Sequence, residues 1–265
     1  MSYPKLSLQQ VTKRFGEMTA LASTDLEVEA GEFVCVVGPS GCGKSTLFNL
    51  ISGVLTPESG KILINNQDVT GSSGHVGYML QKDLLLPWMT VIDNIVLGAI
   101  LKGGASKAQR AAGAALAERY GLGEFIHHYP AALSGGMRQR VALMRTLAMQ
   151  HEIMLLDEPF GALDSQTRLS MQQWLLTVWS EQKRTVIFVT HDIDEAVYLA
   201  DRVVVMSPRP GRIREILKVD IPRPRPLSSL TSPEFTALKR KILDLIYNEN
   251  LLTENEPQEP LAHGA

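Results

Sequence analysis

Residues 38–46 read GPSGCGKST, and this glycine-rich segment strongly limits what the chain can fold into. It matches the pattern G-x-x-x-x-G-K-[ST], in which a loop between a strand and a helix surrounds a phosphate with backbone N–H groups. The segment follows the apolar run Phe33–Val37 and precedes the helix-like stretch Thr46–Ile51. A glycine-rich surface turn with a solvated lysine would need neither neighbour. The sequence therefore predicts a phosphate-binding loop between a buried strand and a helix.

Each residue type in this loop has a physical reason to be there. The glycines let successive N–H groups turn toward an anion, and the following helix adds its positive N-terminal end. Lys44 would reach the β- and γ-phosphates, and the Ser45 hydroxyl would bind Mg²⁺. We also expect the Cys42 thiol to border the phosphates, where an alkylating reagent could reach it. The expected nucleotide contacts are Gly38, Pro39, Ser40, Gly41, Cys42, Gly43, Lys44, Ser45 and Thr46.

The composition agrees with a nucleotide-binding protein in a reducing compartment. The chain has 265 residues, of which 45% are hydrophobic, so it can form a sizeable core. Lysine and arginine number 26 against 28 aspartates and glutamates, which argues against nucleic acid as a partner. Two cysteines, Cys35 and Cys42, are too few for a disulfide framework, and we expect both to be free. Neither a membrane-length apolar run nor a secretory signal is visible, so any role at a membrane would need a partner.

The first part of the chain is rich in strand-like segments. Leu6–Val11 and Ala20–Ala30 alternate in part between apolar and polar residues on either side of a turn-like Lys13–Gly16. This pattern is typical of antiparallel strands with one solvated face. Lys61–Asn65 and His75–Leu80 are further short apolar runs, which we interpret as strands.

Helices and buried strands alternate in the later part. From Thr90 to about residue 119 the pattern is helical, with Thr90 and Ser106 as expected N-caps and the glycines at 103–104 as a break. A helix is also expected over Asp164–Gln182. Near-continuous apolar runs predict a parallel sheet that is buried on both faces; they cover Glu152–Leu156, Thr185–Val189 and Arg202–Met206.

A second glycine-rich helix start lies at residues 133–140, which read LSGGMRQR. Ser134 stands where an N-cap belongs, and Gly135 and Gly136 leave the next backbone N–H groups uncovered. Met137–Met149 continues as an amphipathic helix. Such a helix start can bind an anion. By itself, however, the same pattern also fits an ordinary capped turn.

The C-terminal part predicts a linker and one helix. Ile221–Pro226 is proline-rich and is expected to be extended. Ser232-Pro233 would start a helix, and Thr253–Ala265 is polar and is expected to be mobile. The helix would place one apolar face on the domain, formed by Phe235, Leu238, Ile242, Leu245 and Ile246.

Five motifs in one order resemble the nucleotide-binding subunit of an ATP-binding-cassette (ABC) transporter. They are GPSGCGKST, LSGGMRQR, IMLLDEP at 153–159, GALD at 161–164 and the Thr190-His191 pair. The match covers about residues 6 to 215. It implies an α/β fold of the P-loop NTPase type, with a RecA-like mixed-sheet core, an antiparallel β subdomain and an inserted α-helical subdomain. Residues 1–220 would be the ATPase domain, with the insertion at about 90–145, and 221–265 the C-terminal segment.

The resemblance assigns further site residues. Asp157 would hold Mg²⁺ and Glu158 would polarise the attacking water. Gln81 is similar to a glutamine that contacts both Mg²⁺ and this water, and His191 is similar to a histidine that touches the γ-phosphate. Phe15 stands where the family stacks an aromatic ring on adenine, although Phe-Gly in a turn also fits simple packing. Asp164 matches an aspartate that communicates across a dimer, and it also suits an N-cap.

The resemblance also implies an activity and partners. The chain would hydrolyse ATP with Mg²⁺ as an ABC-type ATPase. Two copies would pair head to tail, so that each ATP lies between the phosphate-binding loop of one and the Ser134–Gly136 helix start of the other. The other expected partners are an integral-membrane permease and, indirectly, an external solute-binding protein. The chain would then lie at the cytoplasmic face of the inner membrane as a peripheral subunit.

Weaker features concern the transported solute. Three segments resemble the nitrate, sulfonate, taurine and bicarbonate importer branch, while pyrimidine-precursor importers have similar loops; they are Gln81–Ile95, Met206–Ile213 and Ile221–Pro226. We expect the permease to dock at Leu84–Ile95. Trp88 and Leu85 suit such a groove, yet ordinary core packing explains them equally well.

Two other classes of protein share part of the pattern. An ABC ATPase of DNA repair or translation would carry long coiled coils or a second cassette, and neither appears between Lys44 and Ser134. A P-loop kinase or GTPase would lack the LSGG helix. The absence of fused membrane spans favours an importer over an exporter.

Overall fold

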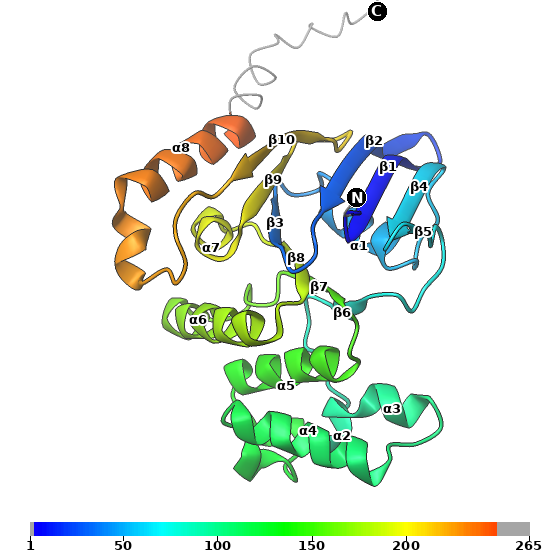
Figure 1. Cartoon of the computed structure of the whole chain (residues 1–265), viewed down its shortest axis with the longest axis vertical. Helices are drawn as coiled ribbons and strands as arrows, with labels where there is room; N and C mark the ends of the chain where they lie inside the picture. Colours follow the sequence, from blue (N-terminus) through cyan, green and yellow to red (C-terminus); the bar gives the residue numbers. More distant parts are fainter. Residues whose placement is uncertain (1–2, 248–265) are drawn as a thin grey trace, which may run out of the picture.

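Two β-sheets form the centre of the computed structural model, which describes residues 3–247 (Figure 1). The strands are β1 (Leu6–Phe15), β2 (Met18–Val28), β3 (Phe33–Val37), β4 (Ser59–Ile64), β5 (Gln67–Asp68), β6 (Gly77–Met79), β7 (Ile153–Asp157), β8 (Thr185–Val189), β9 (Arg202–Met206) and β10 (Ile213–Lys218). One sheet is antiparallel, in the order β2–β1–β4–β5. The other has the order β10–β9–β3–β8–β7–β6, in which only β10 runs antiparallel to its neighbour.

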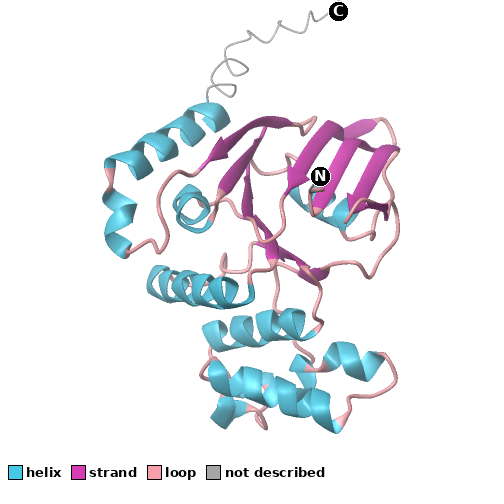
Figure 2. Ribbon diagram, in the orientation of Figure 1, coloured by secondary structure: helices cyan, strands magenta, loops and turns pink. Residues whose placement is uncertain are grey.

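Helices lie on both faces of the six-stranded sheet, and a block of them extends away from it (Figure 2). They are α1 (Lys44–Ile51), α2 (Val91–Ile95), α3 (Leu97–Leu101), α4 (Lys107–Arg119), α5 (Gly135–Ala148), α6 (Ser165–Gln182), α7 (Ile193–Leu199) and α8 (Pro233–Tyr247). Three short 3-10 helices join them, namely η1 (Gly123–Phe125), η2 (Pro130–Ala132) and η3 (Leu227–Thr231). None of the helices within residues 3–247 has the length and apolar character needed to cross a membrane.

Strand β3 is fully buried because apolar clusters cover both of its faces. Phe33, Cys35 and Val37 pack into a cluster with the core residues of α5, α6, α7 and α8. Val34 and Val36 point the other way, into a cluster that contains α1 and the antiparallel sheet. Alternate residues of a strand point to opposite faces, so burial of both faces requires the continuous apolar run that the sequence has. The predicted parallel sheet is confirmed.

Helix caps form at the predicted residues. The side chains of Thr90, Ser106, Ser134 and Asp164 each accept a hydrogen bond from the backbone N–H three residues later, at the starts of α2, α4, α5 and α6. Such a bond satisfies one N–H that the first turn of a helix leaves free. Because a cap depends only on neighbours in sequence, these four starts could be read correctly from the chain.

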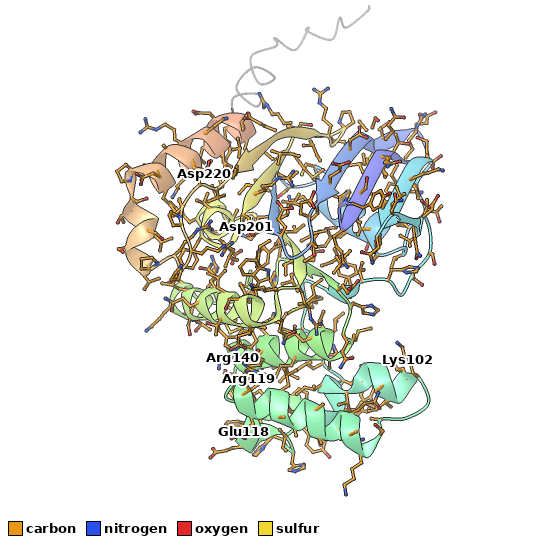
Figure 3. The ribbon with its side chains drawn as sticks, in the orientation of Figure 1. Lys102, Glu118, Arg119, Arg140, Asp201 and Asp220 are labelled. Carbon is orange, nitrogen blue, oxygen red and sulfur yellow. The ribbon has the colours of Figure 1, made fainter. Side chains whose placement is uncertain are left out.

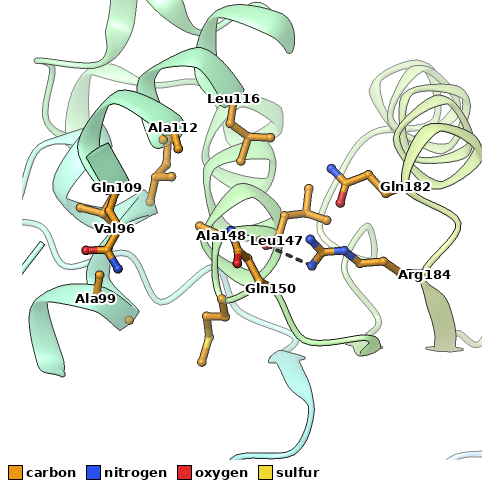
Figure 4. Close-up of a pocket in the computed structure, with 14 residues that line it drawn as sticks. Val96, Ala99, Gln109, Ala112, Leu116, Leu147, Ala148, Gln150, Gln182 and Arg184 are labelled. Carbon is orange, nitrogen blue, oxygen red and sulfur yellow. Dashed lines mark hydrogen bonds between the residues drawn. The ribbon is translucent and has the colours of Figure 1, made fainter. Parts of the chain in front are cut away.

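The block of α2, α3 and α4 lies beyond α5, away from the sheets (Figure 1). At its border with the core, the Arg184 guanidinium donates a hydrogen bond of 3.0 Å to the carbonyl of Leu147, near the end of α5 (Figure 4). The same arginine donates to the His151 carbonyl. A hollow of about 220 Å³ lies beside this contact, between α3, α4 and the end of α5. Arg184 thus ties the last turn of α5 to the edge of β8.

The expected extended segment at 221–226 anchors the C-terminal helix. Asp201, labelled in Figure 3, precedes β9. It accepts hydrogen bonds from the Phe33 N–H (2.9 Å) and the Arg223 side chain (2.8 Å). Arg223 also lies 4.5 Å from the centre of the Trp179 ring. Arg225 is buried, and its guanidinium donates to the backbone carbonyls of Val197, Tyr198 and Ala200. These contacts fix the segment that leads into α8.

Helix α8 buries the apolar face that the sequence predicts. Phe235, Ile242 and Ile246 are buried, while Leu238 and Leu245 are half-buried against the same cluster. On the polar side, Lys239 forms an ion pair of 2.7 Å with Asp194 of α7. The helix therefore packs on the domain as predicted, and the expected mobile tail at 253–265 lies outside the described residues.

Three details differ from the sequence-based prediction. Strand β1 continues to Phe15, so the hairpin turn is Gly16-Glu17 and not Lys13–Gly16. The helical pattern after Thr90 contains three helices, because α2 ends at Ile95 and α3 begins at Leu97. Strand β10 was not predicted, since half of its residues are polar and it pairs only at an edge.

Candidate functional site

Parallel strands bring the predicted site residues to one edge of the six-stranded sheet. The phosphate-binding loop follows β3, and Glu158 follows β7. Gln81 comes two residues after β6, and His191 comes two residues after β8. The carboxyl ends of parallel strands meet at the same edge, which is where ligands bind in open α/β sheets. Segments far apart in sequence therefore meet because the sheet places β3 beside β8, and β8 beside β7.

The phosphate-binding loop is held in a shape that requires glycine. Gly43 is the N-cap of α1 and has φ of +99°, a conformation that L side chains rarely adopt. A Cβ at Gly43 would also lie 3.0 Å from the Ala20 carbonyl oxygen. Lys44 is buried, and its ammonium group donates to the carbonyls of Gly38 (2.8 Å) and Pro39 (3.0 Å). The loop thus curls around its own lysine.

The Cys42 thiol does not face the hollow beside the loop, contrary to our expectation. Cys42 is only 1% exposed and packs in the apolar cluster beneath the loop. Its sulfur lies 3.7 Å from the Lys44 ammonium group. The backbone of a loop residue can bind phosphate while its side chain points into the core, so an alkylating reagent has little access to this thiol. Both cysteines are free, as predicted.

A hollow of about 350 Å³ lies over the loop and is lined by residues from four parts of the chain. Phe15, the residue expected to stack on adenine, is 44% exposed and stands at its wall. Its ring is therefore available to a ligand. Met18, Ala20 and Arg209 also line the hollow and were not predicted. The remaining lining residues are Ser40, Gly41, Gly43, Lys44, Ser45, Thr46 and Glu158.

Two predicted catalytic side chains converge on the carboxylate of a third, Glu158. The Gln81 amide donates a hydrogen bond of 3.1 Å to Oε2 of Glu158. The Nδ1 atom of His191 lies 3.1 Å from the same oxygen. Glu158 has φ of +43°, which is strained for a residue with a side chain and is typical of functional sites. The turn that it makes is fixed by a 2.9 Å hydrogen bond from its N–H to the Val189 carbonyl.

Asp157 is buried beside this trio, and its environment disfavours the charged form. Burial raises the pKa of this carboxyl group, and the Glu158 charge raises it further. The Tyr78 hydroxyl, which donates to Asp157 over 3.4 Å, and the Lys44 charge act in the opposite direction. Burial also raises the pKa of Tyr78 above its usual range. Tyr78 was missed in the sequence because a tyrosine in a short apolar strand looks like ordinary core.

The Ser134–Gly136 helix start belongs to a separate surface. Ser134 accepts a 3.3 Å hydrogen bond from the Met137 N–H. The other N–H groups of the first turn have no partner within the helix. A Cβ on Gly136 would lie 3.0 Å from the Thr167 side chain of α6. None of these three residues is among those that line the hollow over the phosphate-binding loop. The helix start therefore lies outside this hollow within one copy of the chain.

Arg168 connects two loops of the site. Its guanidinium donates to the Leu163 carbonyl over 3.0 Å and to the Asp192 carboxylate over 3.2 Å. Leu163 lies in the GALD segment, and Asp192 is the residue after His191. Asp164 itself caps α6, and hydrogen bonds to Thr167 lower its pKa. Arg168 therefore holds the GALD segment and the loop that carries His191, here called the histidine loop, together within one subunit.

The fold and the site define a P-loop nucleoside triphosphatase. The site has a glycine-rich loop for phosphates, a buried carboxylate with a tyrosine hydroxyl beside it, and three polar side chains at the sheet edge, namely Gln81, Glu158 and His191. The family model for ABC transporters matches residues 21–161. The chain belongs to the ABC transporter ATP-binding family, and it is an ATPase with an ATP-binding cassette fold.

Curated relatives and solved structures agree with this family. An uncharacterized ABC transporter ATP-binding protein of Methanocaldococcus jannaschii is 46% identical over 251 residues, 93% of each chain. The taurine import ATP-binding protein TauB of Yersinia pestis is 41% identical over 235 residues, 87% of this chain and 92% of TauB. The dimeric ABC transporter cassette MJ0796 is 34% identical with a TM-score of 0.70, covering 82% of this chain and 99% of that one. A second solved structure shows MJ0796 as a dimer bound to ADP and phosphate, and its TM-score to this chain is 0.67.

Replacing Asp157 with asparagine removes a charge that folding disfavours. The pKa of Asp157 is higher in the folded protein than in the unfolded chain. At pH values above the folded pKa, the negative charge therefore lowers the free energy of unfolding. This loss fades as the pH falls through the folded pKa. We expect Asp157→Asn to raise the free energy of unfolding of the nucleotide-free protein by roughly 1 kcal/mol at neutral pH, and by less near the usual carboxyl pKa. Urea denaturation at the two pH values measures this. Asp244→Asn, at an exposed site on α8, is the control and should change little. Lower stability of Asp157→Asn at neutral pH would contradict the interpretation.

Proposed function

We propose that this chain is the ATP-hydrolysing subunit of an ABC importer and that its site residues have the roles expected from the sequence. The observation that carries the proposal is the meeting of Gln81, Glu158 and His191 at one carboxylate oxygen, next to the phosphate-binding loop. A carboxylate that is held by two polar neighbours can accept a hydrogen bond from water and orient it. Lys44 and the loop N–H groups would hold the triphosphate.

Mg²⁺ suits the oxygen atoms at this edge. Ser45 offers a hydroxyl, Asp157 a carboxylate and Gln81 an amide oxygen, all of which are hard donors. Within residues 3–247, no cluster of three or more His, Cys, Asp or Glu side chains could form a metal cage. That agrees with Mg²⁺, which proteins often hold through one or two carboxylates together with the substrate's phosphates. Bound Mg²⁺ would neutralise charge that develops on the phosphates during hydrolysis.

Two copies of the chain would complete each site. In the proposed dimer, the N–H groups at the start of α5 in one copy bind the γ-phosphate held by the loop of the other. Hydrolysis removes that bridging group, so the two copies separate. The Arg168 contacts to Leu163 and Asp192 support this step, because they join the GALD segment near the dimer surface to the loop that carries His191.

The role of Glu158 can be tested by a substitution that keeps its shape. We expect Glu158→Gln to bind ATP, to accumulate as an ATP-dependent dimer in size-exclusion chromatography, and to release phosphate at least about 100-fold more slowly than the unaltered chain. In contrast, Lys44→Ala should lose affinity for nucleotide and stay monomeric with ATP, because the phosphates lose their main cation. Rapid hydrolysis by Glu158→Gln would contradict the assigned role.

The segment after Gln81 is suited to sense a membrane partner. Leu84 is 50% exposed and Trp88 is 70% exposed, whereas Leu85 is buried. Core packing therefore explains Leu85 and leaves Trp88 free for a partner. An exposed tryptophan in a loop is costly to leave in water and is common at the centre of interfaces. We place the docking site of a permease helix at Leu84–Ile95.

Hydrogen bonds link this docking segment to α5. Arg145 of α5 donates to the carbonyls of Leu84 (2.8 Å) and Asp83 (2.6 Å). Arg138, near the start of the same helix, forms a 3.1 Å ion pair with Asp83. Displacement of the segment by a permease would move both Gln81 and the LSGG helix. Such a path would couple the membrane subunit to both halves of the nucleotide site.

Trp88 is the residue to alter for this docking site. We expect Trp88→Ser to leave ATP hydrolysis by the isolated chain unchanged, because the side chain is exposed and is not among the residues that line the nucleotide hollow. The amount of permease that copurifies from detergent-solubilised membranes should fall more than about tenfold. Tyr247→Ser, at an aromatic residue of α8 that is 55% exposed, is the control and should copurify as before. Full recovery of the permease with Trp88→Ser would exclude this segment as the main contact.

The proposed solute is a small anion such as nitrate, a sulfonate, taurine or bicarbonate. Support comes from the 41% identity to TauB and from the loops at 84–95 and 206–213. The chain would then work at the cytoplasmic face of the inner membrane, and an external solute-binding protein would deliver the solute to the permease. A pyrimidine-precursor importer is the alternative among transporters. A non-transport ABC ATPase is the alternative outside them.

Transport by the reconstituted complex distinguishes these possibilities. The chain and its copurified permease, placed in liposomes with a solute-binding protein that copurifies with them, should take up radiolabelled taurine or another of these anions only when ATP and Mg²⁺ are present. The complex with Glu158→Gln is the control and should show no uptake. Uptake of a pyrimidine precursor alone would correct the solute. Failure to recover any permease would favour a non-transport ATPase.

A further inference from the structure

The loop between β9 and β10 packs directly on the phosphate-binding loop. A Cβ on Gly211 would lie only 1.9 Å from the Cys42 carbonyl oxygen, so the backbones touch at a point where no larger residue fits. Gly211 also exchanges backbone hydrogen bonds with the β1–β2 hairpin, donating to Ala20 and accepting from Ala22. On the other side, a Cβ on Gly38 would lie 2.9 Å from the Met206 carbonyl. The Ser207–Gly211 loop is therefore fixed against the nucleotide hollow by backbone contacts.

Arg209 is the residue of this loop that reaches the hollow. Its side chain is exposed, and its Nη2 donates a 3.2 Å hydrogen bond to the Gly41 carbonyl. Its Nη1 lies 2.9 Å from the Met18 sulfur, which is a weak acceptor. A guanidinium has five N–H donors in a planar fork that matches phosphate oxygens. Two such contacts leave donors free for a ligand.

The charges around the hollow indicate which part of a nucleotide Arg209 would meet. Lys44 and Arg209 are the two cations that line it, and Glu158 is the only acid. Glu158 marks the end where hydrolysis would occur. Arg209 instead contacts Gly41 and Met18, and Met18 pairs with Phe15 across the β1–β2 hairpin. It thus lies where the ribose and the first phosphates would pass between adenine and the loop.

We propose that Arg209 is a nucleotide-binding residue whose guanidinium binds the α- and β-phosphates, next to the ribose, of the ATP held by the phosphate-binding loop. The proposal rests on the proposed ATP site and adds a second binding loop to it, Ser207–Gly211. Since ADP carries the same two phosphates, Arg209 holds ATP and ADP equally well. Lys44, in contrast, also reaches the γ-phosphate that only ATP has.

Titrations with fluorescent ATP and ADP test this assignment. Arg209→Gln weakens the binding of both nucleotides by a similar factor of about 5 to 10, the loss of a charge-assisted contact at a partly solvated site. The KM for ATP rises by the same factor, while kcat at saturating ATP stays within about twofold. Arg209→Lys recovers part of the affinity because it keeps the charge. Arg240→Gln, at an exposed arginine of α8, removes the same charge far from the hollow and binds as the unaltered chain does.

Salt dependence separates direct binding from a purely structural role of Arg209. A contact between charges weakens as salt rises, so the affinity of the unaltered chain falls more steeply with ionic strength than that of Arg209→Gln. Equal slopes, or unchanged affinity in Arg209→Gln, would overturn the proposal. Loss of ATP affinity with ADP affinity retained would also overturn it, because the contact would then be to the γ-phosphate. Failure of the unaltered chain to bind ATP at all would instead remove the proposed function itself.

Discussion

The parallel pairing of β3 with β8 and β9 is the interaction on which the rest of the structure depends. Backbone hydrogen bonds in these ladders place Val34 opposite Ile187 and Arg202, and both faces of the strand are covered by apolar clusters. With the strands aligned in one direction, the loops at their carboxyl ends emerge together. Within one copy, the phosphate-binding loop, Glu158 and the Arg209 loop all follow strands at that edge. The buried strands supply the rigidity, and the loops supply the chemistry, because loops can expose N–H groups and side chains that a sheet interior cannot.

The same edge concentrates groups whose positions cost stability. Asp157 carries a carboxylate into a buried place, Glu158 holds a left-handed backbone conformation, and Lys44 is buried against loop carbonyls. Proteins retain such features where preorganised charge is useful, and the surrounding core offsets their cost. In this chain the offset comes from the fully buried strands on both sides. Strain and a disfavoured charge thus occur together at the sheet edge, although left-handed residues such as Leu84 and the buried Glu195 are found elsewhere.

Arginine contacts join the segments that our proposal requires to move together. Arg138 and Arg145 join α5 to the segment after Gln81, and Arg168 joins the GALD segment to the histidine loop. The Asp201–Arg223 pair and the buried Arg225 hold the C-terminal helix against the core. Most of these contacts use an arginine that donates to backbone carbonyls. Such a side chain keeps its charge and its several donors in any surroundings, which suits it to hold two loops in register.

Much of the fold and most of the candidate site could be predicted from the sequence, because the signals are local. The phosphate-binding loop, the buried strands and the caps at Thr90, Ser106, Ser134 and Asp164 depend on residues within a few positions of each other. The order of the motifs indicated the family before any geometry was known. The edge strand β10 and the full length of β1 were not predicted. The mixed polarity of β10 and the glycine that follows β1 obscure these strands, which are stabilised by pairing with their neighbours.

What only the tertiary structure decided is which distant segments meet. Gly41 and Arg209 are 168 residues apart in sequence, and Tyr78 and Asp157 are 79 apart, yet each pair is in contact. No periodicity or spacing reveals such contacts, since they follow from the strand order of the sheet. The inward direction of the Cys42 thiol was decided in the same way, by the space that the core left beneath the loop. The sequence by itself determined the kind of chemistry, because that depends on residue types at short spacing; tertiary packing decided which further side chains surround it.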